Sequence, residues 1–511
     1  MSLPLPQITF EVQQGGLGRR PSNDDYISGF IAYIANGNLP AGFTTSDRIK
    51  RVFSVQEAEA LGINLNYTDE TKATGTYTIS AVGSNGDTIE LFVPQPSGTP
   101  ISLGVYTKTA AETTVTLVAA AIVAIINAGT YSHGFTATNA AGVITITAAA
   151  GLGAYLNTLS ATATIVGTIA GSAAAFSGGV GSRIAVFHYH ISEYFRLKPN
   201  GQLYIGLYSA YGTNFEEVTL VQTYANGAIR QMAILHDFST AYATTQVTKI
   251  QARCDEVFGQ YRPMVAIFAP EITGTASVSS LPNNSTLDSE MVSVTIGQDA
   301  GARGLYLYQT IKKSISDLGA KLGVLSASSV SQSWAWVGQF NMSDGTELDT
   351  IGFSNGEAYT SIAAGALESL NGYAYCFLRK LEGITGTYNN QPNTATLLTS
   401  DFRYIYLNRV LQKAIRLVRA NTLPSVSSPI VLNSNGTLPD WQVENLQTLG
   451  NTALLQMISD GELSDGQTIV SPSQNVLATN TINEAIQLLP IGVADYINIE
   501  IGYVSQLTQQ S

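Results

Sequence analysis

Residues 400–422 read SDFRYIYLNRVLQKAIRLVRANT, and their apolar side chains recur at helical spacing. This pattern predicts a helix over Asp401–Ala420 with one face on a hydrophobic core. Ser400 precedes it and is placed to act as the N-cap, because its hydroxyl can accept a hydrogen bond from the first turn. The apolar face consists of Leu407, Val410, Leu411, Ala414, Ile415 and Val418.

Basic residues line another face of the same predicted helix. Arg409, Lys413 and Arg416 share that face, and Arg419 lies at its edge, in a chain whose net charge is −12. Three interpretations stay open at this point. The strip is a solvated surface, a docking strip for an acidic protein surface, or a contact for nucleic acid.

The chain beyond this helix predicts a separate α+β lobe over residues 399–511. Asp440–Asp460 has a second helical pattern, with an expected interruption near Gly450, and two strand-like stretches follow. The last stretch, Tyr496–Val504, alternates strictly between apolar and polar residues and predicts a strand. Its apolar face is formed by Ile497, Ile499 and Ile501, against Asn498 and Glu500.

Upstream, residues 183–398 alternate between predicted strands and predicted helices. This order is typical of a three-layer α/β sandwich. The expected strands are Ile184–Ile191, Gln202–Leu207, Met264–Ala269, Met291–Ile296 and Tyr373–Leu378. The expected helices are Ser239–Gln260, a region from Ile311 to Leu322, and Ala358–Leu370. Residues 26–70 begin the same domain and include a short predicted helix at Val55–Gly62.

Residues 71–182 differ in character and predict an inserted, small β-rich domain. Short alternating runs such as TYTISAV, DTIELFV and GVITITA are separated by turn residues, with one helix expected at Glu112–Ala128. The Gly-rich stretch Ser177–Ser182 marks the outer boundary. The only charged residues in this segment are Lys72, Asp87, Glu90, Lys108 and Glu112.

The first 25 residues predict an arm instead of the start of a core. Ile8, Phe10 and Val12 alternate with polar residues and form an expected strand. The Gly-rich and charged residues 13–23 then predict a flexible tether that joins this strand to the rest of the chain.

The composition excludes several classes of protein. Only 12% of residues are charged, about half the usual fraction of roughly 25%. The acidic balance argues against nucleic-acid binding, and two cysteines do not make a disulfide framework. No secretory signal is visible, and the longest apolar run, Leu117–Ala128, is shorter than the about 20 residues of a membrane span. We therefore expect a soluble protein made in the cytoplasm, without membrane insertion.

The enzymatic motifs are weak. Gly352–Gly356 matches the GxSxG pattern of a hydrolase nucleophile, but all four histidines precede Ser354, so the required order of serine, acid and histidine is absent. His188 and His190 flank Tyr189 on an expected strand and could begin a metal site, although a half-buried pair is the simpler interpretation. No phosphate loop or dinucleotide motif is present. We expect no enzyme activity, no cofactor and no metal.

Two stretches carry a resemblance to a known family. SDFRYIYLNRVLQKAIRLVRANT at 400–422 and LLPIGVADYINIEIGYV at 488–504 resemble the C-terminal helix and closing strands of contractile-tail sheath proteins. The 71–182 segment is similar to insertion domains of phage sheath and tail proteins, and the layout of residues 183–507 follows the same family. The first residues depart from it, because PQITFEV stands where many sheath proteins have a Pro-Gly-Val-Tyr-like strand.

The resemblance implies a function in assembly. Sheath subunits form a helical homo-oligomer around an inner tail tube and meet baseplate and terminator proteins. Their central lobe is subtilisin-like in fold only, and their terminal strands pair with sheets of neighbours. The basic strip at Arg409, Lys413 and Arg416 would then face the tube. Such a protein is assembled in the cytoplasm into a virion tail or an injection particle. The alternatives are another non-enzymatic tail, baseplate or surface assembly protein, and a cryptic hydrolase.

Overall fold

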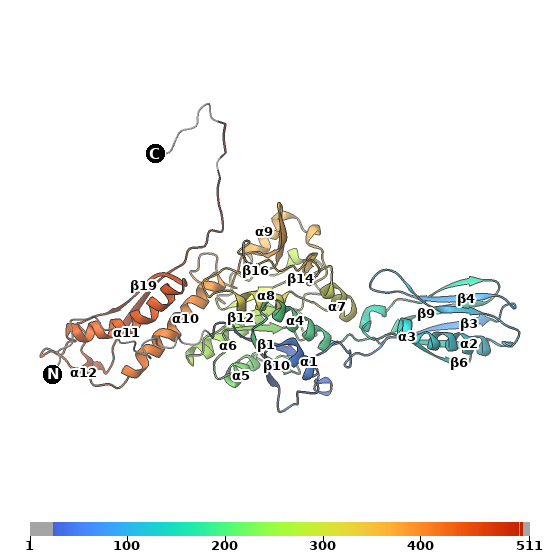
Figure 1. Ribbon diagram of the computed structural model, residues 1–511, viewed down its shortest axis with the longest axis horizontal. Helices are drawn as coiled ribbons and strands as arrows, with labels where there is room; N and C mark the ends of the chain where they lie inside the picture. The colour runs from blue at the N-terminus through green and yellow to red at the C-terminus, as the bar shows by residue number, and fades with distance from the viewer. Residues whose placement is uncertain (1–23, 500, 504–511) are drawn as a thin grey trace, which may run out of the picture.

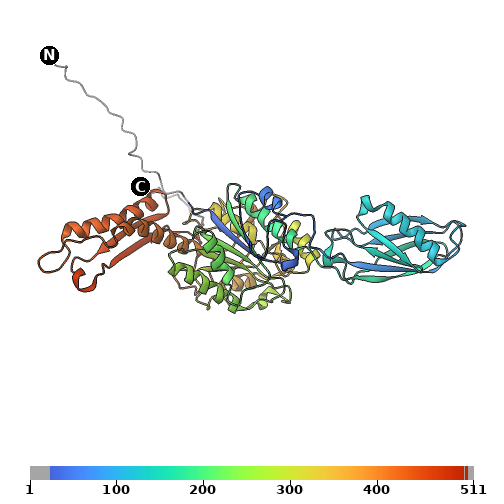
Figure 2. The same cartoon turned by 90° about the horizontal axis from the view of Figure 1, so that it is seen from below.

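Three bodies follow one another along the long axis of the molecule in the computed structural model, which describes residues 24–499 and 501–503 (Figure 1). An α/β core lies in the middle, with a β-rich domain at one end and a helical lobe at the other (Figure 2). The predicted mixed α/β, multi-domain organisation is confirmed. The likeness of the core to the subtilisin fold stays a prediction.

The core is built on a seven-stranded sheet in the order β16-β13-β12-β11-β1-β10-β2. All neighbouring strands are parallel except β10 and β2, which are antiparallel. The strands are β1 (Ile27–Tyr33), β2 (Ile49–Val52), β10 (Gln202–Tyr208), β11 (Gln231–Leu235), β12 (Val265–Ala269), β13 (Val292–Thr295) and β16 (Tyr375–Cys376).

Helices cover both faces of this sheet, so the central strands are buried on both sides. In β12, Val265 and Ile267 face one hydrophobic cluster while Ala266 and Phe268 face the other, as the alternation of side chains along a strand requires. The first face carries α1 (Val55–Ala60), α4 (Arg183–Leu197), α7 (Arg303–Ile311) and α8 (Leu318–Ala327). The second carries α5 (Glu216–Tyr224), α6 (Thr244–Gly259) and α9 (Ala364–Gly372).

The structure corrects the prediction of a strand at Ile184–Ile191. This segment lies within α4, and all eight of its residues are buried. Helical periodicity is invisible in such a run, because every face of the helix is buried here and no exposed polar stripe alternates with an apolar one. The Ser182 hydroxyl caps the helix by accepting a hydrogen bond from the Ala185 N–H at 3.0 Å.

Close packing of α4 on α8 explains why residue 319 of α8 is a glycine. A Cβ on Gly319 would lie 2.1 Å from the His190 carbonyl oxygen, which no side chain tolerates. The region expected to be helical from Ile311 to Leu322 is divided between α7, which ends at Ile311, and α8, which begins at Leu318. Two small antiparallel pairs complete the core: β14 (Gly297–Asp299) with β15 (Ile351–Phe353), and β17 (Leu378–Leu381) with β18 (Ile384–Asn389).

The β-rich domain has its own hydrophobic core, separate from the two clusters of the central sheet. A four-stranded sheet has the order β6-β7-β3-β9 and a three-stranded sheet the order β5-β4-β8. The strands are β3 (Thr74–Ala81), β4 (Thr88–Val93), β5 (Ile101–Thr107), β6 (Thr136–Ala140), β7 (Val143–Thr147), β8 (Thr162–Val166) and β9 (Ala170–Ser177). The helices are α2 (Val115–Ala128) and α3 (Thr130–His133).

This domain joins the core through a narrow connection. Thr71 and Val180 exchange two backbone hydrogen bonds, of 3.0 and 2.8 Å, so the chain enters and leaves the domain side by side. The Glu70 carboxylate accepts hydrogen bonds from the N–H groups of Gly151 and Gly153, and the Tyr306 hydroxyl donates to the Gly151 carbonyl at 3.0 Å. Few contacts thus cross the boundary.

We predict that the domain can be removed without unfolding the core. Replacing residues 72–179 by Asn-Gly should close the Thr71–Val180 pair with a tight hairpin turn. The loss of free energy of unfolding should stay within about 1–2 kcal/mol, because no buried residue of the core is changed. Thermal unfolding followed by circular dichroism measures this, and an insoluble or molten product would contradict it.

The C-terminal lobe packs α10 (Ile405–Thr422) against α11 (Asp440–Ser459), and α11 against a two-stranded sheet. The sheet pairs β19 (Leu463–Val470) with β20 (Glu484–Pro490), and the short helix α12 (Val476–Thr479) lies between them in sequence. The interruption expected near Gly450 is absent, since α11 is continuous. A Cβ on Gly450 would lie 2.2 Å from Thr468 Oγ1, so this glycine allows β19 to approach the helix.

Candidate functional site

The segment that follows β20 leaves the lobe and crosses to the core before it ends. Asp495 fixes this crossing, because its Oδ2 accepts hydrogen bonds from the Tyr404 hydroxyl at 2.8 Å and from Gln391 Nε2 at 3.1 Å. Both donors lie outside the segment, one just before α10 and one after β18. The direction of the chain at Asp495 is therefore set by the folded body.

Beyond Asp495 the chain projects away from the body (Figure 1). Ile497, Ile499 and Ile501 are 78%, 76% and 92% exposed, a costly arrangement for β-branched apolar side chains. These residues make no strand pair within the described part of the chain. We call Tyr496–Tyr503 the C-terminal arm. It has the alternation of a strand without a partner.

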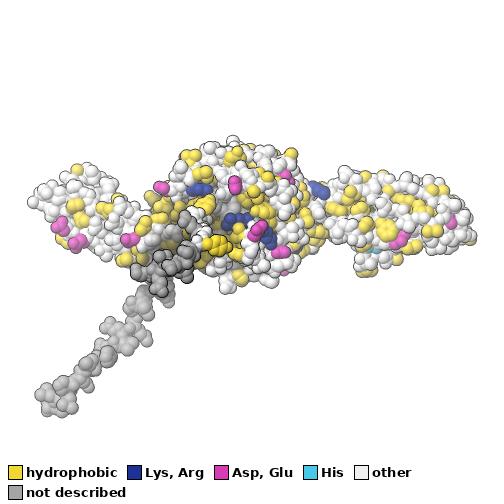
Figure 3. Space-filling model, turned by 90° about the horizontal axis from the view of Figure 1, so that it is seen from above, with side chains coloured by type: hydrophobic (Ala, Val, Ile, Leu, Met, Phe, Trp, Pro, Cys, Tyr) yellow, Lys and Arg dark blue, Asp and Glu magenta, His cyan; other side chains and the backbone are white. Residues whose placement is uncertain are grey.

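Figure 3 shows one face of the molecule, on which charged side chains are few and hydrophobic side chains are scattered along the whole length. Little charge must therefore lose its water when another protein covers this face.

The C-terminal lobe contains a sheet with open edges. Among the described residues, β19 and β20 pair only with each other, in a register from Leu463↔Pro490 to Val470↔Glu484. One face of this sheet rests on α11, whereas Ile486 and Leu489 of β20 are exposed. An open edge presents unpaired N–H and C=O groups that can pair with a further strand. We call β19–β20 the open sheet.

The predicted N-terminal arm strand, at Ile8, Phe10 and Val12, lies outside the described residues. The described chain begins at Asp24, directly before β1.

The basic residues of α10 are not a solvent-exposed strip, which corrects the sequence interpretation. Arg409 and Lys413 are buried, and the Arg416 side chain is only 19% exposed. Lys413 Nζ lies 2.5 Å from Asp25 Oδ2 and 2.7 Å from Glu462 Oε1, and Arg416 reaches Asp25 at 2.7 Å. The cluster of Asp25, Lys413, Arg416 and Glu462 is called the junction network below.

The junction network joins three parts of the chain that are far apart in sequence. Asp25 precedes β1 of the core, Lys413 lies on α10, and Glu462 lies between α11 and β19. Burial raises the pKa of the Asp25 carboxyl, but Lys413 and Arg416 outweigh burial and hold it below its usual value. Burial raises the pKa of Glu462, and Lys413 only partly offsets this. Lys413 therefore stabilises two buried carboxylates at once.

The rest of the polar face of α10 also contacts the core. Asn408 Nδ2 donates to the Glu290 carbonyl at 2.8 Å, and Gln412 Nε2 donates to the Met264 carbonyl at 3.1 Å. Arg409 Nη1 donates to the Ser328 hydroxyl at 2.9 Å. α10 is thus buried on two sides, by the lobe and by the core, and its polar residues pair with core groups instead of water.

The GxSxG motif does not form a nucleophile site. Ser354 lies in the turn after β15 and is fully buried. Its backbone N–H donates to the Ile296 carbonyl at 2.9 Å, which holds the turn against the end of β13. A substrate cannot reach this hydroxyl, so the motif belongs to the packing of the core.

The histidine pair is also separated. His188 and His190 lie two residues apart on a helix, so they point in different directions instead of sharing the face of a strand. His188 Nε2 lies 2.8 Å from Glu59 Oε1 near the surface, while burial lowers the pKa of His190 to about 3. Within residues 24–499 and 501–503, no group of three or more His, Cys, Asp and Glu side chains is placed to hold a metal ion. No helix in this same range is both long and apolar enough to cross a bilayer.

Comparison with protein families gives two matches that together follow nearly the whole sequence. The model of the DUF2586 N-terminal domain matches residues 5–392, and that of the DUF2586 C-terminal domain matches residues 401–508. No curated protein matches the sequence.

The chain is similar to several solved structures at low identity. A chain of the contracted helical sheath of the anti-feeding prophage has 15% identity and a TM-score of 0.44, with 61% of this chain and 81% of that chain covered. A sheath tail protein from Listeria innocua has 12% identity and a TM-score of 0.39, with 91% and 94% covered. A chain of the anti-feeding prophage baseplate in its contracted state has 10% identity and a TM-score of 0.45, with 98% and 99% covered. Two of these three are described as sheath proteins.

Proposed function

The chain belongs to the DUF2586 family, and we propose that it is a structural subunit of a contractile tail sheath. In this proposal the subunits polymerise helically around an inner tube by exchanging terminal strands. Contraction of the polymer then drives the tube through a target envelope.

The observation that carries the proposal is an exposed segment with the alternation of a strand, together with a sheet that has open edges. Ile497, Ile499 and Ile501 of the C-terminal arm are exposed, and the open sheet has edges without a partner strand among the described residues. Adding the arm of one copy to the open sheet of another would pair the free backbone N–H and C=O groups of both. Backbone hydrogen bonds supply affinity in such an addition, and the alternating side chains set the register.

The geometry of donor and acceptor favours an open polymer. The arm points away from the body, so its own open sheet is not its partner in the described chain (Figure 1). Donor and acceptor are different surfaces, and a contact between different surfaces repeats head to tail. Such heterologous contacts form rings or helical filaments, whereas a self-complementary patch forms a closed dimer.

The N-terminal strand at Ile8, Phe10 and Val12 would be a second donor. Its tether allows the core to rotate while the strand stays paired, which contraction requires. The low charge of the surface suits broad contacts between subunits that change during contraction.

The proposed partners are further copies of the chain, an inner tube protein, and baseplate and terminator proteins. The tube-facing role of the α10 basic residues is not part of this proposal, because their charges are paired inside the molecule. The proposal needs no enzyme activity and no cofactor, and it places the protein in a tail or injection particle assembled in the cytoplasm.

Deletion of residues 1–14 tests the contribution of the N-terminal arm. We expect a folded chain, since the deletion touches none of the described residues, but one that fails to form long tubes. Electron microscopy of negatively stained samples measures tube length, and circular dichroism checks the fold. Normal tubes from the truncated chain would exclude a role for this strand.

A further inference from the structure

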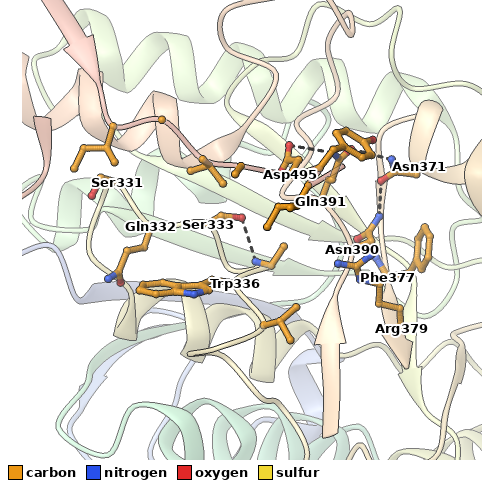
Figure 4. Close-up of a pocket in the computed structure, with 18 of the residues that line it drawn as sticks. Ser331, Gln332, Ser333, Trp336, Asn371, Phe377, Arg379, Asn390, Gln391 and Asp495 are labelled. Atoms are coloured by element: carbon orange, nitrogen blue, oxygen red, sulfur yellow. Dashed lines mark hydrogen bonds between the residues drawn. The ribbon is translucent and has the colours of Figure 1, made fainter. Parts of the chain in front are cut away.

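A large groove lies where the C-terminal segment crosses the core. It has a volume of about 880 Å³ and is bordered by the loop after α8, by β17, and by residues 491–497. Trp336 lies on one side of it, and Phe377 and Arg379 lie on the other (Figure 4). Tyr359 and Leu367 add further apolar surface. We call this the aromatic groove.

The aromatic groove has features of a binding site. The Trp336 side chain is 50% exposed although it is the largest apolar side chain in the lining. Arg379 Nε is buried and has no hydrogen-bond partner among the described residues. The amide side chains of Asn390 and Gln391 also line the groove. An apolar wall with a few polar donors is typical of a site for an extended ligand.

One segment of the chain has a sequence suited to such a site and is not used by strand exchange. Residues 3–6 read Leu-Pro-Leu-Pro. Proline fixes its own φ and restricts the preceding residue to extended conformations, so this sequence favours a polyproline II helix. Pro4 and Pro6 also lack the N–H that a central position in a β-ladder needs. The predicted strand therefore begins after them.

We infer that the aromatic groove binds residues 3–6 of the same chain before the subunit assembles. Proline-rich segments dock into grooves lined by aromatic residues, where the prolines pack on the rings and carbonyl groups accept hydrogen bonds from side chains. Trp336 and Tyr359 would supply the rings here, and the Arg379 guanidinium a donor. Leu3 and Leu5 are uncharged and match the apolar lining.

The start of the described chain lies close to the groove, which favours the same chain as the source. Asp24 borders a second pocket that Ser329 and Glu462 also line, and Ser331 and Gly461 border the aromatic groove. The two pockets are thus neighbours along the same two segments. If residues 7–23 behave as a flexible chain, their end-to-end distance is roughly 20–25 Å, and this keeps residues 3–6 at an effective concentration on the order of millimolar.

Docking of residues 3–6 would hold the N-terminal arm on its own subunit and delay its pairing with others. This docking concerns the unassembled chain and does not require that strand exchange occurs. The bound segment would also cover the exposed Trp336 ring. Assembly would release the arm by offering residues 8–12 a stronger partner.

Cysteine cross-linking in the full chain tests this inference. The pair Leu5→Cys and Leu367→Cys should form a disulfide within one chain at least tenfold faster than the control pair Leu5→Cys and Tyr131→Cys. Tyr131 is fully exposed in the insertion domain and is not among the residues that line the aromatic groove. The two native cysteines do not interfere, because both are buried and burial raises the pKa of each thiol.

Two further variants separate docking from chance encounter. Adding Pro4→Ala and Pro6→Ala should slow the cross-link at least fivefold without touching the folded core, and Trp336→Ala should slow it similarly. Equal rates for the Leu367 and Tyr131 pairs, or no effect of the proline changes, would overturn the inference. Disulfides that form only between chains in dilute protein would also overturn it, because they place the segment in a neighbour.

Discussion

A chain that ends at Asp495 should fold normally and stay monomeric under conditions where the full chain forms tubes. The truncation removes Ile497, Ile499 and Ile501, each more than three-quarters exposed in the isolated subunit. It leaves the Asp495 hydrogen bonds to Tyr404 and Gln391 in place. Burying three isoleucines against a neighbour is worth about 1.5–3 kcal/mol each. Their loss should weaken subunit association by at least 1,000-fold, since each 1.4 kcal/mol is tenfold.

Sedimentation velocity and negative-stain imaging measure this effect. A matched pair of variants distinguishes the apolar face of the arm from its length. Replacing the three isoleucines by asparagine should abolish tubes, whereas Asn498→Thr, on the opposite face, should leave them intact. Tubes of normal length from the truncated chain would exclude the C-terminal arm as a donor.

The Lys413→Met variant should lose about 3–5 kcal/mol of its free energy of unfolding. Lys413 compensates both Asp25 and Glu462 inside the junction network, at 2.5 and 2.7 Å. Removing one partner of a buried ion pair leaves an uncompensated charge, which costs far more than the pair itself contributes. The carboxylate of Glu462 is the most affected, because Arg416 still reaches Asp25.

Denaturant unfolding of Lys413→Met and of Lys380→Met provides the comparison. Lys380 pairs with Asp349 at 3.1 Å at the surface, where both side chains are over one-third exposed. Its removal should cost no more than about 1 kcal/mol. The deficit of Lys413→Met should shrink as the pH falls toward about 4. Burial raises the pKa of the Glu462 carboxyl in the folded state, so this carboxyl takes up a proton there and no longer carries an uncompensated charge. Equal costs for the two variants would contradict the structural role of the network.

The sequence predicts those parts of the fold where periodicity and burial agree. The helices at Thr244–Gly259 and Ile405–Thr422 lie within five residues of their expected bounds, and the strands at Val265–Ala269 and Val292–Thr295 lie within one. These elements have a distinct apolar pattern, so local sequence is sufficient. The alternation at the C-terminus also points directly to the C-terminal arm.

The errors arise where tertiary contacts override local pattern. Residues 184–191 of α4 are all buried, so this stretch shows no helical period and its pattern predicts a strand. The basic residues of α10 were assigned to a surface because they form the polar face of an amphipathic helix. Asp25 and Glu462, the partners of Lys413, lie 388 and 49 residues away from it in sequence. The local pattern therefore does not indicate this pairing. The open sheet was missed as an acceptor for the same reason, since free edges are a property of the assembled lobe.

Strand exchange between copies of the lobe is most directly tested by cryo-electron microscopy of particles formed by the purified full chain. The account predicts a helical tube in which residues 496–503 of one subunit lie along the β19–β20 sheet of a neighbour and extend it. Discrete particles under every condition, or a tube in which this segment pairs with no other copy, would contradict it.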